Sequence, residues 1–85
     1  NAASERAAAD SEAARCLDDN RKRLEGALQA VVARGRRDGS LKGGAEAAVA
    51  ARYLYSVMLG VRALAKAGSP CAQLKEVVDM ALGTV

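Results

Sequence analysis

Residues 45–67, AEAAVAARYLYSVMLGVRALAKA, decide the fold of this chain. As a helix, this stretch is about 35 Å long at about 1.5 Å per residue. Its apolar residues form two neighbouring stripes with helical spacing. The first stripe is Ala47, Ala50, Leu54, Val57, Val61 and Leu64, and the second is Ala48, Ala51, Met58 and Ala65. A helix that is apolar nearly all round is normally buried on more than one side. The surrounding chain is too short to bury it completely, so we expect a second copy of the molecule to cover the remainder.

The same stretch is about long enough to span a bilayer. Arg52 and Arg62 lie inside it, however, and each costs about 3 kcal/mol at the bilayer centre. No uninterrupted apolar run reaches the required length. We therefore expect no membrane contact and a cytoplasmic location.

Size and composition also favour a partner. With 85 residues the chain forms one domain, residues 1–85, just above the size at which a single core supplies only a few kcal/mol of stability. It contains no Phe, no Trp and two Tyr, and its apolar content is mostly alanine, which buries little area. The chain begins at Asn1 without a signal segment, which suggests a fragment or a processed chain.

The helix propensity of the sequence is high nearly everywhere, which predicts an all-α fold. Residues 1–9 are interpreted as the end of one helix, and Asp10 or Ser11 as the cap of a second helix that runs to Arg37. Apolar positions in steps of three and four give this second helix one buried face. Those positions are Ala14, Leu17, Arg21, Leu24, Leu28, Val31 and Gly35, of which Arg21 and Gly35 interrupt the seam.

Three arginines in ARGRR, residues 33–37, precede Asp38-Gly39. We interpret them as a solvated helix end whose cations complement the helix dipole. The alternative is a phosphate-binding patch, but no aromatic residue is interleaved to stack on bases. The 13 basic and 10 acidic side chains are interspersed, so the net charge of +3 is weak evidence for a nucleic-acid surface.

The connection SLKGG, residues 40–44, is short, so we expect the two long helices to lie side by side as an antiparallel hairpin. Gly68 and Ser69-Pro70 mark the start of a shorter final helix, residues 70–82. Two copies that place the central and final helices together form a four-helix-bundle dimer interface. Small residues such as Ser56 and Gly60 on the central helix allow close backbone approach there. The predicted interface residues are Leu54, Ser56, Val57, Gly60, Val61, Leu64, Leu74, Val78 and Ala81.

No catalytic or metal-binding constellation is present in the sequence. There is no His to act as a base near neutral pH, and Cys16 and Cys71 do not form a paired zinc motif. Asp18 and Asp19 are adjacent on a helix and point in different directions. We therefore expect no enzyme activity, no metal and no cofactor. The cysteines are interpreted as small semi-apolar residues in a reducing compartment, with a redox role for Cys71 as the alternative, because the helix dipole stabilises a thiolate in a first turn.

The order of segments resembles the C-terminal half of TetR-type (tetracycline-repressor-like) transcriptional regulators. The resemblance spans essentially the whole chain. The segments that carry it are NAASE at 1–5, Asp10, ARGRRDGSL at 33–41, LYSVMLGVRALAKAG at 54–68 and AQLKEVVDMAL at 72–82.

This resemblance implies an all-helical homodimer whose last two helices form the dimer bundle. It also implies a small-molecule effector that releases operator DNA, with Tyr53, Tyr55 and Met58 as candidate pocket residues. The helix-turn-helix that reads DNA in this family is not present in these residues, so the resemblance implies DNA binding only through that missing N-terminal part. Two alternatives remain open: a stand-alone helical interaction or assembly module, and a thiol-based redox sensor.

Overall fold

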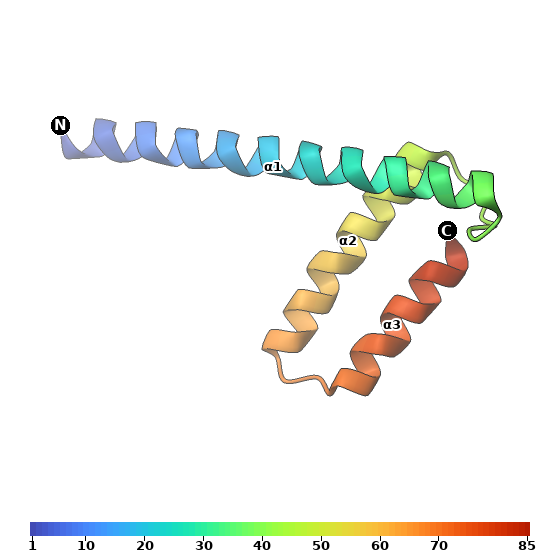
Figure 1. The fold of residues 1–85 in the computed structure, drawn as a ribbon. Helices are drawn as coiled ribbons and strands as arrows, with labels where there is room; N and C mark the ends of the chain where they lie inside the picture. Colours follow the sequence, from blue (N-terminus) through green and yellow to red (C-terminus); the bar gives the residue numbers. More distant parts are fainter.

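In a computed structural model that describes all residues 1–85, the chain forms three helices and no strand. Helix α1 spans Ala2–Asp38, α2 spans Ala47–Lys66 and α3 spans Cys71–Thr84. The all-α prediction is confirmed. Helices α2 and α3 run antiparallel, and α1 lies across the end of this pair, with its N-terminal half projecting away from the rest of the chain (Figure 1).

Helix α1 is continuous, so the predicted break at residues 9–11 is wrong. The side chain of Asn1 accepts a hydrogen bond of 2.9 Å from the backbone N–H of Ser4 and caps the helix. Asp10 and Ser11 instead lie exposed inside the helix. They are flanked by alanines, and the strong helix propensity of alanine outweighs the capping preference of two exposed polar side chains.

The two later helices begin and end within two residues of the predicted bounds. Gly39 ends α1 with φ 84°, a left-handed conformation that glycine adopts without a Cβ penalty. Gly68 follows α2 with φ 92°, and the N–H of Ser69 donates a 3.0 Å hydrogen bond to the carbonyl of Leu64. Pro70 is the N-cap of α3 rather than its first residue. Local turn chemistry therefore determines these helix ends.

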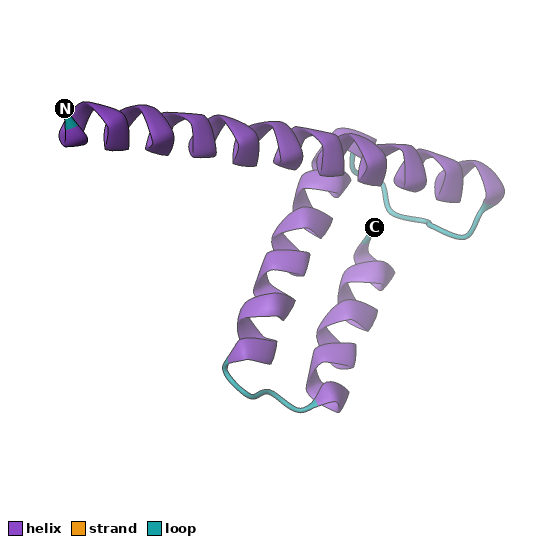
Figure 2. Ribbon diagram, turned by 60° about the vertical axis from the view of Figure 1, so that its left-hand side comes forward, coloured by secondary structure: helices purple, strands orange, loops and turns teal.

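The arrangement of α1 differs from the predicted hairpin. A short connection requires only that two helix ends lie close together, and it does not require the helices to be parallel. Here α1 crosses α2 steeply in both ribbon views, and the antiparallel pair is α2 with α3 (Figure 2). The predicted hairpin of the two long helices is therefore wrong, although a hairpin of helices is present.

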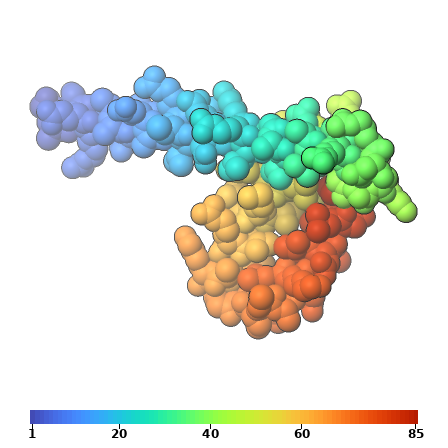
Figure 3. All heavy atoms as spheres, viewed as in Figure 1, coloured from blue at the N-terminus to red at the C-terminus, as the bar shows by residue number.

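The core lies where the last turns of α1, the start of α2 and the end of α3 meet. Val32, Ala50 and Val85 form its centre, and Leu41 and Leu54 pack against them. Only six of the 85 residues are buried. The Cα radius of gyration is 16.8 Å, against about 12 Å for a globular chain of this length. The single chain is therefore flat and extended, with overall extents of 56 × 32 × 14 Å (Figure 3).

Candidate binding grooves and association residues

Two open grooves flank the point where α1 crosses α2. The first, which we call the apolar groove, lies between all three helices and has a volume of about 400 Å³. Nine of its ten lining residues are hydrophobic, and the tenth is Arg62. Its lining residues are Leu28, Val31, Leu54, Val57, Met58, Val61, Arg62, Val78, Ala81 and Leu82.

The second groove, which we call the α1–α2 corner, lies between the projecting part of α1 and the middle of α2. Its volume is about 660 Å³ and its lining mixes apolar and polar groups. The lining residues are Ala14, Leu17, Asp18, Asn20, Arg21, Leu24, Tyr55, Met58, Leu59 and Arg62. Arg62 and Met58 thus line both grooves.

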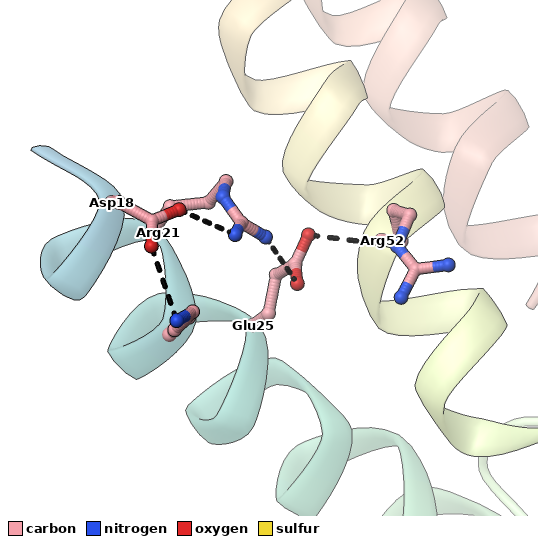
Figure 4. A network of polar contacts seen from close by, with 5 residues as sticks. Asp18, Arg21, Glu25 and Arg52 are labelled. Carbon is pink, nitrogen blue, oxygen red and sulfur yellow. Dashed lines mark hydrogen bonds and ion pairs between the residues drawn. The ribbon is translucent and has the colours of Figure 1, made fainter. Parts of the chain in front are cut away.

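Four charged residues of α1 beside the corner, Asp18, Arg21, Lys22 and Glu25, form an ion network with α2 (Figure 4). Arg21 donates to Asp18 at 2.7 Å and to Glu25 at 3.1 Å, and Arg52 of α2 lies 3.8 Å from the other oxygen of Glu25. Hydrogen bonds from Arg21 and Lys22 lower the pKa of Asp18 from its usual 3.8, because both stabilise the carboxylate. Every carboxylate in this network therefore already has a cationic partner.

The basic end of α1 has a structural role for one of its arginines. Arg36 donates hydrogen bonds to the backbone carbonyls of Ala45, just before α2, and Val85, directly after α3. Arg34 and Arg37 are exposed, as a solvated helix end requires. The interpretation as a dipole-matched helix end therefore applies to Arg37, since Arg34 lies before the last turn and Arg36 joins three segments. Nothing in the sequence separates Arg36 from its neighbours, because its partners lie 9 and 49 residues away.

The structure divides the nine predicted interface residues into two groups. Five of them line the apolar groove within the single chain, and Ala81 is only 2% exposed. These five are Leu54, Val57, Val61, Val78 and Ala81. Ser56, Gly60 and Leu64 are exposed and share one side of α2 by their spacing, while Leu74 is half-buried and lines neither groove. Ala81 and Leu54 therefore contribute to folding of one chain, and Ser56, Gly60 and Leu64 remain available to a partner.

The three predicted pocket residues do not all line the same groove. Tyr55 and Met58 line the α1–α2 corner, whereas Tyr53 lines neither groove and is 38% exposed. Arg62 was not among the predicted site residues. The sequence signal for Arg62 is a cation flanked by apolar residues on α2, but its place between two grooves depends on how α1 crosses α2.

Neither cysteine is paired, and both Cys16 and Cys71 are exposed. Cys71 is the first residue of α3, which is the position that the redox hypothesis requires. No group of three or more His, Cys, Asp or Glu side chains is placed to hold a metal ion.

Large apolar side chains remain uncovered in the single chain. Met80 is 75% exposed, Leu17 71% and Leu82 51%.

Helix α2 is also long and apolar enough to cross a membrane, judged by length and composition alone. A single helix of this kind is weak evidence for a membrane span, and Arg52 and Arg62 interrupt it.

Comparison with models of known families, with curated proteins and with solved structures gives no match for this chain.

Proposed function

We propose that this chain is the dimerisation and effector-binding part of a TetR-like transcriptional repressor. The observation that carries the proposal is the exposure of apolar side chains on α2 and α3 in a chain with six buried residues. An isolated chain that leaves this much apolar surface in water has little net stability, since burial of such surface is the main favourable term in folding. Pairing with a second copy covers it.

The exposed positions on α2 favour a helix-packing interface. Gly60 has open space where a Cβ would stand, and Ser56 and Leu64 lie on the same side of the helix. A glycine inside a helix costs about 1 kcal/mol relative to alanine. Close approach of a partner helix compensates this cost, and such an approach is typical of helical bundles with small residues at the contact.

The regulatory role follows from how a dimer bundle acts in this class of protein. A bundle that holds two DNA-reading domains at a fixed separation sets their spacing at about 34–36 Å, one helical repeat of DNA. A small molecule that binds one arrangement more tightly shifts this spacing. The two grooves beside the α1–α2 crossing are the places where such a molecule has apolar walls to contact.

Light scattering after size exclusion tests the dimerisation step. We expect twice the mass of one chain at micromolar concentration, and a single-chain mass for Leu64→Glu, which places a charge among the exposed apolar residues of α2. Leu17→Glu is the matched control, because Leu17 is exposed on α1 and is not among the predicted interface residues. A stable, folded single-chain species for the unmodified protein would refute the proposal.

The same surface is compatible with the second candidate, a helical assembly module without a DNA-reading partner. The sequence encoded immediately upstream of Asn1 separates the two. A helix-turn-helix there supports the repressor, whereas an initiator methionine directly before Asn1 supports the assembly module.

A further inference from the structure

We propose that the α1–α2 corner is the effector site and that it binds an amphipathic anion, a carboxylate with an extended apolar tail. This inference deepens the proposed effector-binding function and rests on it. The corner has a volume within the range of small-molecule sites, about 300–1,000 Å³. None of the nine predicted interface residues lines it, whereas five of them line the apolar groove.

The apolar part of the site comes from both helices. Leu17 and Leu24 line the groove from α1, and Met58 and Leu59 line it from α2. Leu17 is 71% exposed and Leu59 48%, so a ligand tail lying between them covers apolar surface that the chain leaves in water. Burial of that surface favours binding, because it removes apolar side chains from water.

The charge of the site selects the head group. Asp18 already accepts from Arg21 and lies 3.1 Å from Lys22, while Arg21 is shared between Asp18 and Glu25. Arg62 is different, because no carboxylate of the chain lies within ion-pair distance of its guanidinium. The lining therefore carries one uncompensated positive charge beside an apolar wall, which is complementary to a carboxylate on an apolar tail.

Decanoate, used below its micellar concentration, is the probe, and decyltrimethylammonium carries the same tail on a cationic head. Isothermal titration measures affinity, and chemical-shift mapping of backbone amides locates binding. We expect decanoate to shift amides around Leu17, Leu24 and Leu59 and to bind more tightly than the cation. Arg62→Gln should weaken decanoate binding by about tenfold or more, the effect of one lost charge-assisted hydrogen bond. Arg62→Lys should restore most of the affinity.

Arg23→Gln is the control for net charge, because Arg23 is exposed on α1 and lines neither groove. Its decanoate affinity should equal that of the unmodified chain. Equal binding of the anion and the cation, an unchanged affinity in Arg62→Gln, shifts confined to the apolar groove, or no decanoate binding would each overturn the inference. Light scattering on the same samples tests the dimerisation proposal independently of the anion site. A single-chain species that binds decanoate would refute dimerisation and would still support the anion site.

Discussion

The guanidinium of Arg36 donates a hydrogen bond of 3.3 Å to the backbone carbonyl of Val85, which joins the last turn of α1 to the end of α3. The N–H of Gly43 donates to the same carbonyl at 3.0 Å. A second nitrogen of Arg36 reaches the carbonyl of Ala45, just before α2. One arginine thus joins the end of α1 to the segment just before α2 and to the residue after α3, beside the core formed by Val32, Ala50 and Val85.

Replacement of Arg36 by methionine removes these bonds and keeps much of the side-chain volume. We expect the free energy of unfolding to fall by about 1–2 kcal/mol, the usual effect of losing hydrogen bonds from a charged donor that is partly exposed. Thermal unfolding followed by circular dichroism at a fixed protein concentration measures the change. Arg37→Met, at an exposed neighbour, should change stability by less than about 0.5 kcal/mol. Equal effects of the two variants would show that Arg36 does not join the segments.

Val32 and Val31 are adjacent in sequence but differ sharply in burial, at 0% and 61% exposed. Val32→Ala leaves a cavity beside Ala50 and Val85, so we expect a loss of about 2 kcal/mol. Val31→Ala should cost less than about 0.5 kcal/mol in the absence of a partner. Urea unfolding of both variants tests the pair, and similar losses at the two positions would contradict the position of the core.

The sequence predicts the helices well because local chemistry determines them. Gly39 and Gly68 both take the left-handed conformation expected after a helix, and Pro70 precedes the last helix. The break expected at Asp10 fails for a physical reason. An N-cap residue favours a helix start only where the preceding residues leave the helix, and the preceding alanines do not.

The crossing of α1 over α2 was not predictable from helical periodicity. The seam through Leu24, Leu28 and Val31 shows which side of α1 is apolar, but it gives no angle to the neighbouring helix. The contacts beside the crossing join residues distant in sequence: Leu41 packs against the core, and the N–H of Gly43 donates to the carbonyl of Val85. The grooves depend on the same crossing, so Arg62 was recognised only as a polar interruption of an apolar helix.

The ion pairs of Asp18 make stability depend on acid pH. Its pKa in the folded chain is lowered from 3.8 by Arg21 and Lys22, so the unfolded chain binds a proton at this position more readily than the folded chain. The stabilising contribution is therefore present above the unfolded pKa and is lost as the pH falls through the folded pKa. Asp18→Asn should lose less stability than the unmodified chain between pH 5 and pH 2. Asp19→Asn is the neighbouring control, because Asp19 forms no ion pair. Urea unfolding across this range measures both, and parallel curves for Asp18→Asn and the unmodified chain would contradict the assignment.

The contact between Glu25 and Arg52 is the ion pair that joins α1 to α2. The two atoms lie 3.8 Å apart, and the Arg52 side chain is 71% exposed. A double-mutant cycle with Glu25→Gln and Arg52→Gln should give a coupling energy of about 0.2–1 kcal/mol that decreases with added salt. A coupling above about 2 kcal/mol would mean that the pair is more buried than the structure shows, as when a partner chain covers it.

Gly26 and Gly60 offer a matched test of the association face, because both lie inside helices and a Cβ at either position would meet no other part of the chain within 4 Å beyond its own stretch of helix. Gly26→Ala should raise the free energy of unfolding by about 1 kcal/mol, since alanine is the better helix former. Gly60→Ala should give a smaller gain or a loss if a second copy packs closely on α2, and Gly60→Leu should convert the dimer to a single chain in light scattering. The Gly60 effect should also depend on protein concentration, because it acts on association. Should Gly60→Ala stabilise the protein as much as Gly26→Ala while Gly60→Leu remains a dimer, no helix of a partner approaches α2 at this position, and the dimer must form elsewhere.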